Sequence, residues 1–349
     1  MNHRERFEQE LAGALAFPGV EDLDGKTVLI TGATGLIGFT LVKALLHYGA
    51  GRENPPRVLA FVRNREKAEK LFRDVPKERL EFLVGDVQDP ISTEEPIDYI
   101  VHAASVTSSK AFVGQPVDTI RTAVNGTVNV LELAREKKVR SFVYLSSMEV
   151  YGAPETDEKI TESHGTNLDT MSVRSSYPEG KRMCEALCTA YFAQYGVPAK
   201  VVRLTQTFGP GVAYNDGRVF AEFARCAIEK RNIVLHTAGE TRRNYLYTVD
   251  AAGAILTVLL KGKSGEAYNA ANEATYCSIL DMARMVAEKC AVGEIGVDIQ
   301  LEAESKFGYA PVLKMNLDTS KIRGLGWEPK ASLEEMFQRL IADFRADPC

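Results

Sequence analysis

The sequence has little of what marks several specialised classes of protein. Its six cysteines, among 349 residues, form no CxxC pair and have no histidine at ligand spacing, which excludes a zinc finger and a secreted disulfide scaffold. With 42 basic and 47 acidic side chains the net charge is −5, so nothing attracts nucleic acid or an anionic membrane electrostatically. No apolar run approaches the ~20 residues of a membrane span. We therefore expect no metal, no nucleic-acid or membrane partner, and a reducing, cytoplasmic environment.

A regular alternation of two kinds of segment dominates the chain. From residue 27 onward, short β-branched runs alternate with stretches long enough for a helix. The runs that predict buried strands are 28–30, 58–62, 82–84, 99–101, 142–145 and 200–204. The stretches that predict helices lie near 37–49, 65–73, 115–137 and 177–195. This alternation predicts the α/β class, with a doubly wound parallel sheet of the Rossmann type and a smaller α/β substrate-binding lobe.

The predicted domain boundaries follow from where the alternation begins and ends. Residues 1–25 interleave charged and apolar side chains, which predicts an N-terminal helical extension and not a signal peptide. The dinucleotide-binding domain is expected over 26–205, with about 241–272 returning to it. Loops and Gly/Pro turns after residue 205 predict a substrate lobe from about 206–240 and 273–349, including two helices near 278–290 and 332–345.

A glycine-rich turn follows the first predicted strand, in the segment TGATGLIG, residues 31–38. Gly32 permits the tight turn, Gly35 lets the backbone approach a pyrophosphate, and Gly38 lets the following helix pack closely against the sheet. The helix N-terminus adds free N–H groups and a positive dipole. We therefore expect a dinucleotide at this turn, with these binding residues: Gly32, Thr34, Gly35, Leu36, Ile37 and Gly38.

The end of the second predicted strand bears on the choice between NAD and NADP. NAD-specific enzymes usually place an acidic residue there for the ribose diol, whereas this chain has Arg63-Asn64-Arg65. Because a guanidinium group suits a 2′-phosphate, Arg63 favours NADP. The alternative is that both arginines are solvated residues at the start of a helix.

A tyrosine and a lysine four residues apart are the candidate reacting groups. Tyr177 and Lys181 project from the same face of a predicted helix. A free phenol is a poor base at neutral pH, but a nearby ammonium and an oxidised nicotinamide both favour the phenolate. Ser147 follows a buried strand 30 residues upstream and can hydrogen-bond the substrate oxygen that Tyr177 deprotonates. The order glycine turn, Ser147, Tyr177, Lys181 is a specific constellation.

These motifs resemble those of the extended short-chain dehydrogenases/reductases that modify nucleotide sugars. The resemblance covers about 26–345 and includes the spacing of the glycine turn, the segment RLTQTFGPG at 203–211, RNYLYTVD at 243–250 and LGWEP at 325–329. It implies a nucleotide-diphosphate sugar as substrate, oxidation at sugar C4 with bound NAD(P), and a homodimer built from the helices near 115–137 and 177–195. Family resemblance favours NAD, in contrast to Arg63.

The resemblance also implies roles for residues that no motif would single out by itself. It adds these residues to the cofactor site: Asp86, Val87, Ala103, Ala104 and Asn125, besides Tyr177 and Lys181. For the substrate it implies these: Ser105, Gln206, Arg218, Leu235 and Arg243. His102, next to the small-residue turn, is interpreted as a packed strand-end residue.

The reaction that follows C4 oxidation depends on the triplet Ser147-Met148-Glu149. Sugar 4,6-dehydratases and UDP-glucuronate decarboxylases carry a glutamate at the third position, and simple 4-epimerases usually lack it. We therefore assign Glu149 a catalytic role and expect chemistry at C5 or C6, of the 4,6-dehydratase/epimerase type. Met148 counts against ordinary dehydration, because it replaces the acid that helps to expel the C6 hydroxyl.

UDP-glucuronate decarboxylation is the alternative. The segments around Tyr177–Arg182 and 215–219 resemble the decarboxylases, whereas Phe112 and Gly211 stand where those enzymes have Tyr and Arg. A glucuronate site needs a cation for the carboxylate, and Lys110 is one candidate. A third interpretation is a non-catalytic nucleotide-binding protein on the same fold, against which the retained Tyr177 and Lys181 argue.

Overall fold

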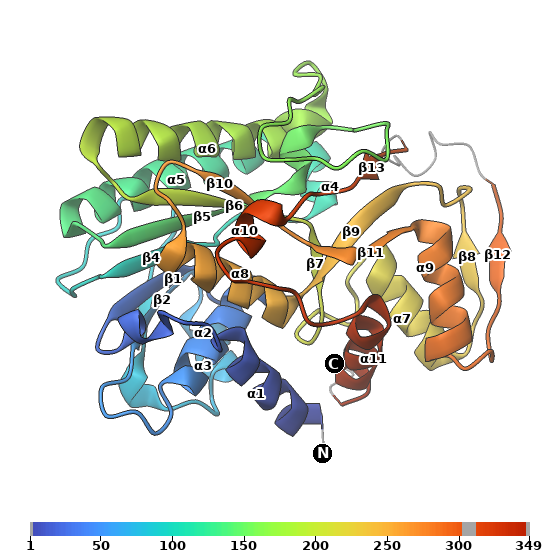
Figure 1. Cartoon of the computed structure of the whole chain (residues 1–349), viewed down its shortest axis with the longest axis horizontal. Coiled ribbons are helices and arrows are strands. Elements are labelled where there is room, and N and C mark those ends of the chain that lie inside the picture. The colour runs from blue at the N-terminus through green and yellow to red at the C-terminus, as the bar shows by residue number, and fades with distance from the viewer. Residues whose placement is uncertain (1–2, 302–311, 347–349) are drawn as a thin grey trace.

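The computed structural model describes residues 3–301 and 312–346 of the chain. Its centre is a seven-stranded sheet in the order β10-β6-β5-β4-β1-β2-β3, in which every neighbouring pair is parallel (Figure 1). The strands of this sheet are β1 (Thr27–Thr31), β2 (Arg57–Val62), β3 (Leu80–Val84), β4 (Tyr99–His102), β5 (Ser141–Ser147), β6 (Ala199–Leu204) and β10 (Ala267–Ala270). The predicted doubly wound parallel sheet is confirmed.

The strands read as apolar runs because both faces of the sheet are covered. Every residue of β1 and β4 is buried. The strand order reverses between β1 and β4, and Thr31 at the carboxyl end of β1 lies beside Phe61 and His102 of its two neighbours. In open α/β sheets this reversal is the place where ligands bind, outside the carboxyl ends of the strands.

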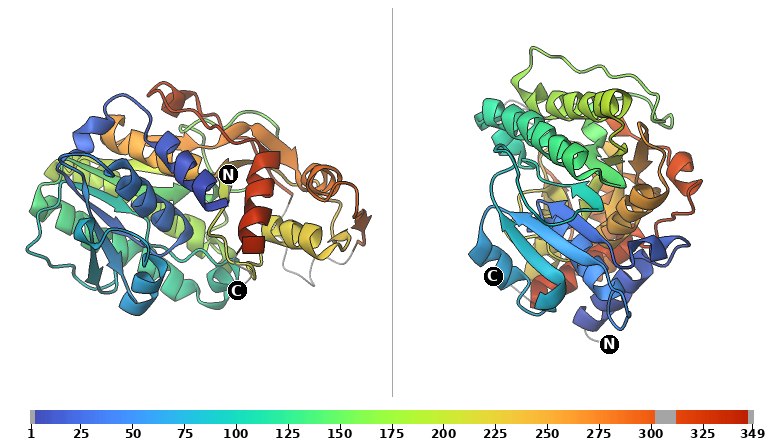
Figure 2. Two further views of the ribbon diagram at one scale, coloured as in Figure 1. Left: turned by 90° about the horizontal axis from the view of Figure 1, so that it is seen from below. Right: turned by 90° about the vertical axis from the view of Figure 1, so that its left-hand side faces the viewer.

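Helices cover the two faces of the sheet in separate groups (Figures 1 and 2). One face packs against α2 (Leu36–Tyr48), α3 (Arg65–Leu71) and α8 (Thr248–Lys261). The other packs against α5 (Pro116–Lys137) and α6 (Ser176–Tyr195), with α4 (Ser109–Gly114) at their edge. Short 3₁₀ turns connect several elements: η1 (Val20–Leu23), η2 (Lys77–Arg79), η3 (Met148–Tyr151) and η4 (Val173–Ser175).

A smaller lobe lies beyond the carboxyl ends of the strands. Its main sheet has the order β11-β9-β13, with β7 also paired to β9, and a separate pair joins β8 and β12. The strands are β7 (Gln206–Phe208), β8 (Ile233–Leu235), β9 (Arg242–Tyr247), β11 (Asn272–Ser278), β12 (Val297–Ile299) and β13 (Lys314–Met315). The helices are α7 (Val219–Glu229), α9 (Ile279–Met285), a π-helical turn η5 (Val286–Cys290), α10 (Ser320–Arg323) and α11 (Leu333–Ala346).

The segment that we expected to return to the first lobe divides between the two lobes. β9 belongs to the smaller lobe, since it pairs with β7 and β11, whereas α8 packs on β5 and β6 and β10 extends the large sheet. No helix among the described residues combines the length and the apolar character needed to cross a lipid bilayer.

The N-terminal extension forms a helix that touches both lobes. α1 (His3–Ala14) packs against α2 and α8 of the large lobe and against α11 of the smaller one. Leu11 and Leu15 bury their side chains there. Glu10 accepts a hydrogen bond from the Tyr247 hydroxyl at 2.5 Å and pairs with Arg339 of α11 at 2.9 Å. α1 therefore braces one lobe against the other.

Candidate active site

The glycine turn between β1 and α2 leaves no room for side chains. Gly32 has φ +67°, and a Cβ there would lie 2.8 Å from the backbone of Ala104 after β4. A Cβ on Gly38 would lie 2.2 Å from the Gly32 carbonyl oxygen, so α2 packs directly on the turn. Gly35 is exposed at the start of α2, whose first N–H groups have no partner within the helix. The turn therefore offers a bare backbone cradle that fits the pyrophosphate of a dinucleotide.

The ends of β2 and β3 supply the outer part of this surface. Arg63 follows β2 and is exposed, while Asn64 caps α3 by accepting a hydrogen bond from the Lys67 N–H at 2.8 Å. Arg65 pairs with Glu69 along α3. After β3, Asp86 accepts the Gln88 N–H at 3.0 Å, and its neighbour Val87 is buried.

The end of β4 is tied to β1 and α5 by a buried histidine. His102 Nδ1 lies 2.7 Å from the Thr31 hydroxyl, and Nε2 lies 3.3 Å from the Thr127 hydroxyl. Burial, with a smaller effect from the Lys181 charge, lowers the pKa of His102 to about 3. His102 is therefore neutral and holds three elements together, while the Ala104 N–H also binds the Thr31 hydroxyl at 3.2 Å.

Ser147 and Glu149 lie at the end of β5, where the chain turns into η3. The Ser147 hydroxyl accepts the Glu149 N–H at 3.2 Å and so caps this turn. Met148 between them is buried in a small apolar cluster, and the Thr205 hydroxyl contacts its sulfur at 3.3 Å. The side chain of Glu149 is 31% exposed, in contrast to that of Met148. The triplet therefore presents a serine and a glutamate to the site and withdraws its middle residue.

Tyr177 and Lys181 occupy the first turns of α6, facing the end of β5. The Tyr177 ring stacks on Phe112 with a centroid separation of 4.1 Å. Lys181 is buried and donates a hydrogen bond to the Leu145 carbonyl oxygen at 2.7 Å, with Nζ 5.7 Å from the centre of the Tyr177 ring. Burial lowers the pKa of Lys181 to about 8.

The electrostatic surroundings of Tyr177 favour the protonated phenol. Burial raises the pKa of Tyr177 well above its ordinary value, and the Glu149 carboxylate raises it further. A hydrogen bond with Ser147 and the charges of Arg174 and Arg218 act in the opposite direction. Forming the phenolate therefore requires additional positive charge at the site, which an oxidised nicotinamide ring carries.

Arg174 is a site residue that the sequence analysis did not identify. Its guanidinium lies 2.8 Å from the Glu149 carboxylate and over the Phe112 ring, 4.8 Å from its centre. The side chains of Arg174, Glu149, Phe112 and Tyr177 therefore form one cluster. A signal was available, because Arg174 lies three residues before Tyr177, a spacing that puts both on one side of a helical turn.

The smaller lobe contributes polar side chains from β7 and β9. The Arg243 Nη1 donates to the Gln206 amide oxygen at 3.2 Å. The Arg243 Nε is buried and has no hydrogen-bond partner among the described residues. A buried donor without a partner is costly, and an anionic group such as a phosphate would satisfy it. These two predicted substrate residues are brought together.

Two other predicted substrate residues have different environments. Arg218 precedes α7, and its positive charge acts to lower the pKa of Tyr177. Leu235 of β8 is 6% exposed and packs in the main core. Ser105, after β4, donates its hydroxyl to the Val106 carbonyl oxygen at 3.2 Å.

Asn125, which the resemblance assigns to the cofactor site, lies on a different face of α5 from Thr127. Gly126 and Thr127 are buried on the side of α5 that faces the sheet, whereas Asn125 is exposed. Successive residues of a helix are turned by about 100°, so Asn125 cannot share the face of Thr127. The side of α5 next to α6 is instead occupied by Ala123, whose carbonyl oxygen accepts the Cys184 thiol at 3.2 Å.

Fold and site together define a class of protein. A parallel Rossmann sheet has its glycine turn, a serine and a Tyr–Lys pair gathered around the reversal point of the strand order, which is the arrangement of a short-chain dehydrogenase/reductase. No group of three or more His, Cys, Asp or Glu side chains within residues 3–301 and 312–346 could hold a metal ion.

The chain belongs to the NAD dependent epimerase/dehydratase family, whose model matches residues 28–271. It is 31% identical over 328 residues to UDP-glucuronic acid decarboxylase 1 of Xenopus tropicalis, covering 94% of this chain and 74% of that protein. It is 32% identical over 319 residues to UDP-glucuronic acid decarboxylase 1 of Arabidopsis thaliana, covering 91% and 69%.

Solved structures with the same fold include enzymes of several reactions. The UDP-N-acetylglucosamine 4-epimerase of Methanobrevibacter ruminantium superimposes with a TM-score of 0.79 at 19% identity, covering 92% of this chain and 98% of that one. The dTDP-glucose 4,6-dehydratase of Bacillus anthracis, in complex with NAD, gives 0.75 at 21% identity, covering 92% and 97%. The predicted family, fold and NAD(P)-dependent, nucleotide-sugar-modifying class of enzyme are confirmed.

Proposed function

We propose that the protein decarboxylates a nucleotide-linked uronic acid, with UDP-glucuronate as the first substrate to test. The observation that carries this proposal is the Arg174 guanidinium beside Tyr177 and Glu149. A sugar whose C4 hydroxyl meets Tyr177 and Ser147 has its C5 substituent one bond further along the ring. Arg174 supplies the cation that a C5 carboxylate needs, which the sequence had offered only at Lys110. The relatives at about 31% identity are decarboxylases of this substrate.

The proposed roles of the reacting groups follow from their positions. Tyr177 takes the proton of the C4 hydroxyl, Ser147 holds the same oxygen, and Lys181 favours the phenolate once it faces the cofactor. NAD(P), held at the glycine turn between β1 and α2, would supply the oxidant for C4 and the hydride that later restores it. The C4 ketone receives the electron pair of the breaking C5–carboxylate bond, so CO₂ leaves and an enolate is protonated at C5. We assign the dinucleotide to the large lobe and the nucleotide sugar to the smaller one, with Gln206 and Arg243 on the diphosphate.

A panel of nucleotide sugars incubated with NAD and the protein tests this reaction. Mass spectrometry should find a product from UDP-glucuronate that has lost CO₂, and none from UDP-glucose. Arg174→Gln should raise KM for the uronate by roughly 10–100-fold, the scale of a charge-assisted hydrogen bond, without weakening UDP binding. Arg182→Gln is the matched control, because Arg182 pairs with Glu179 on the exposed side of α6. A product that has lost water would overturn the proposal.

Dehydration is the second candidate, and the position of Glu149 beside Tyr177 favours it. In that reaction Glu149 removes the C5 proton after C4 oxidation. Glu149→Gln should then lower turnover by about 10²–10⁴-fold while reduced nicotinamide accumulates in a single turnover. In the decarboxylase the same variant should retain more turnover, because CO₂ loss needs no base at C5. The buried Met148 argues against dehydration, since it supplies no acid for the departing hydroxyl.

A homodimer and a cytosolic location complete the proposal. Exposed apolar side chains on α5 and α6, among them Val117, Ile120 and Met183, support a helical dimer interface. Leu131 of α5 lies outside this surface, because its side chain is fully buried against the sheet. The five described cysteines are free, which supports a reducing compartment, and fractionation of cells would test it.

A further inference from the structure

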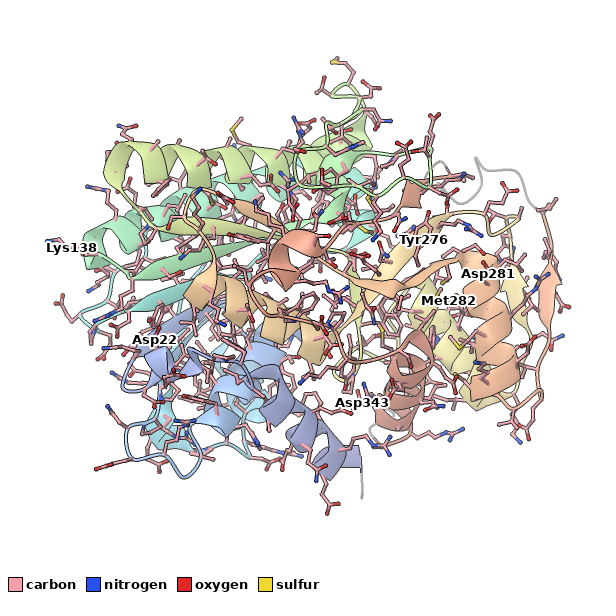
Figure 3. The ribbon with its side chains drawn as sticks, in the orientation of Figure 1. Asp22, Lys138, Tyr276, Asp281, Met282 and Asp343 are labelled. Carbon is pink, nitrogen blue, oxygen red and sulfur yellow. The ribbon has the colours of Figure 1, made fainter. Side chains whose placement is uncertain are left out.

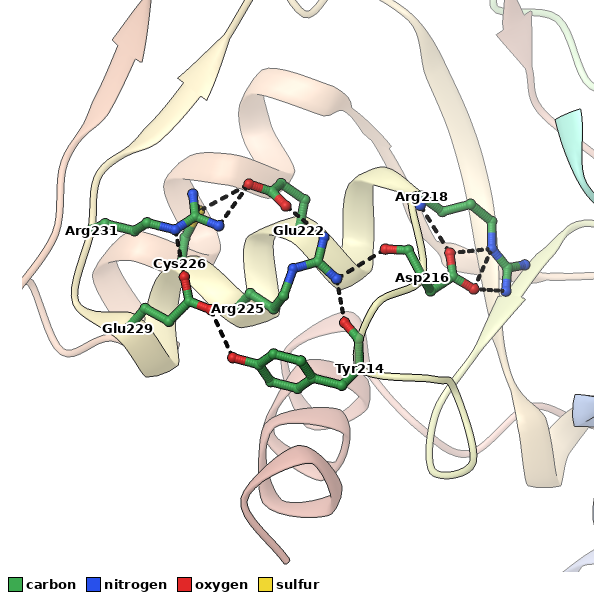
Figure 4. A network of polar contacts seen from close by, with 8 residues as sticks. All are labelled: Tyr214, Asp216, Arg218, Glu222, Arg225, Cys226, Glu229 and Arg231. Carbon is green, nitrogen blue, oxygen red and sulfur yellow. Dashed lines mark hydrogen bonds and ion pairs between the residues drawn. The ribbon is translucent and has the colours of Figure 1, made fainter. Parts of the chain in front are cut away.

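Arg218 is fixed by a carboxylate two residues away. Its Nε and Nη2 donate to the Asp216 carboxylate, the shortest contact being 2.6 Å, and its backbone N–H donates to the same group at 2.9 Å (Figure 4). Although burial favours the protonated acid, the hydrogen bonds of Arg218 lower the pKa of Asp216 below its ordinary value. Asp216 therefore stays ionised and binds the edge of the guanidinium formed by Nε and Nη2.

The loop that carries Asp216 is held in turn by a second arginine. Arg225 lies in the second turn of α7, and its side chain is 13% exposed. Its Nη1 donates to the backbone carbonyl oxygens of Tyr214 and Asp216, the latter at 2.9 Å, and its Nη2 donates to Glu222 at 2.5 Å (Figure 4). A guanidinium can serve two carbonyls and a carboxylate at once because its donors are held in a rigid plane.

The opposite side of the same loop rests on α11. Asp343 of that helix, labelled in Figure 3, accepts the Gly211 N–H at 2.7 Å. The ring of Phe344 packs edge-on against that of Tyr214, with centroids 5.0 Å apart. The loop is therefore held between α7 and α11 of the smaller lobe. The contacts of Arg225 include the backbone of Asp216, the residue that binds Arg218.

We propose that Arg225 is a positioning residue, which fixes the loop of residues 214–218 so that Arg218 meets the phosphates of the substrate without rearrangement. The inference rests on the proposed function, because it takes a nucleotide diphosphate as the group that Arg218 receives. Without Arg225 two carbonyl oxygens lose their donor and the loop can adopt other conformations. Ordering it on binding would then cost conformational entropy, so affinity would fall although Arg218 is intact.

Arg225→Gln removes these contacts, and Arg231→Gln is its matched control. Arg231 follows α7 and belongs to the same network, but it pairs with Glu222 and Glu229 and reaches the loop only through Glu229, which accepts the Tyr214 hydroxyl (Figure 4). Calorimetric titration with UDP should show about a 10-fold weaker Kd for Arg225→Gln and less than about a 2-fold change for Arg231→Gln. Titration with NAD should be unchanged in both variants, because the dinucleotide binds to the other lobe.

A double-mutant cycle separates positioning from a general loss of structure. In an Arg218→Gln background, Arg225→Gln should weaken UDP binding by less than about 2-fold, because there is no guanidinium left to position. Equal losses in both backgrounds, or full UDP affinity in Arg225→Gln, would overturn the inference. These affinities do not depend on turnover, so a protein that binds UDP and releases no CO₂ would sink only the proposed reaction. A wild type that bound no UDP would sink both.

Discussion

At the scale of single residues, the reacting phenol is surrounded by charges of both signs. The Glu149 carboxylate opposes ionisation of Tyr177, whereas Arg174 and Arg218 favour it. The Glu149–Arg174 pair is partly exposed, with 31% and 38% of the side chains accessible, so a ligand can reach and rearrange it. An anionic sugar would compete with Glu149 for Arg174. The Glu149–Arg174 pair would therefore influence both which sugar binds and how readily Tyr177 loses its proton.

The cofactor preference is a second question at this scale. Arg63 is exposed at the end of β2 and forms no ion pair with any residue that the structure describes. A guanidinium that is not engaged by a carboxylate can form charge-assisted hydrogen bonds to a 2′-phosphate. We expect NADP to bind at least as tightly as NAD, and Arg63→Ala to weaken NADP by about 10-fold while NAD is little changed. Competition calorimetry on the apoprotein measures both, with Arg65→Ala as control, and a clear NAD preference that survives in Arg63→Ala would contradict this.

At the scale of elements, the candidate site lies at the carboxyl ends of the strands, whereas a buried lysine lies near the opposite end of β6. At the start of β6, Lys200 is 5% exposed and donates hydrogen bonds to the Ser141 hydroxyl at 2.5 Å and to the Leu259 carbonyl oxygen. No carboxylate within the described ranges forms an ion pair with Lys200. This lysine therefore links β6 to β5 and α8 through two uncharged hydrogen-bond acceptors. The junction lies at the edge of the sheet opposite the candidate reacting groups.

Burial gives this junction a predictable pH dependence. It lowers the pKa of Lys200 from 10.5 to about 8, so the folded state disfavours the charged form. The penalty is complete below pH 8 and disappears as the pH rises toward 10.5, where the unfolded chain also loses its proton. Lys200→Met should therefore be more stable than the wild type near neutral pH, by about 1–3 kcal/mol, and this advantage should shrink at higher pH.

Urea unfolding of both proteins between about pH 7 and 9.5 measures this difference. Subtracting the two curves removes the contribution of the other titrating groups, including Lys181. Unfolding free energies that run parallel over this range would show that Lys200 carries no penalty. Lys263→Met provides the control, because Lys263 is exposed and pairs with Glu266.

At the scale of the whole molecule, the site exists only where the two lobes meet. The large lobe supplies Tyr177 and Glu149, and the smaller lobe supplies Arg218 and Arg243. The helix α1 contacts both lobes, and its Glu10 joins Arg339 of the smaller lobe at 2.9 Å. The relative placement of the lobes therefore decides how the charges of one reach the reacting group of the other.

The proposed dimer belongs to this scale. On α5 and α6, Ile120 and Met183 are 43% and 54% exposed, on the layer that covers one face of the sheet. We expect sedimentation equilibrium to give a dimer at micromolar concentration. The double variant Ile120→Glu with Met183→Glu should be a monomer, because the dimer would bury the new carboxylates without a positively charged partner. Leu71→Glu on α3, 38% exposed and outside this layer, should stay dimeric. A monomeric wild type would contradict the interface.

The sequence by itself determined the class of fold and predicted the candidate reacting groups. Strand and helix periods are local, so the alternation from residue 27 predicts the parallel sheet, and the four-residue spacing of Tyr177 and Lys181 puts both on one face of α6. The glycine turn could also be predicted from the sequence. Its three glycines are needed because the backbone of Ala104 and of the turn itself lies too close for a side chain. Each of these patterns lies in residues that are near one another in the chain.

Only the tertiary structure decided the charges around the reacting phenol. Arg174 meets Glu149 across 25 residues of chain that follow no helical or strand period, and Arg218 reaches Tyr177 from the other lobe. Asn125 faces outward because the packing of α5 on His102 fixes the rotation of the helix, which the apolar pattern alone left open. The local pattern sets which elements form, whereas loop paths and the rotation of packed helices set which side chains meet, and the latter depend on contacts that no period in the sequence encodes.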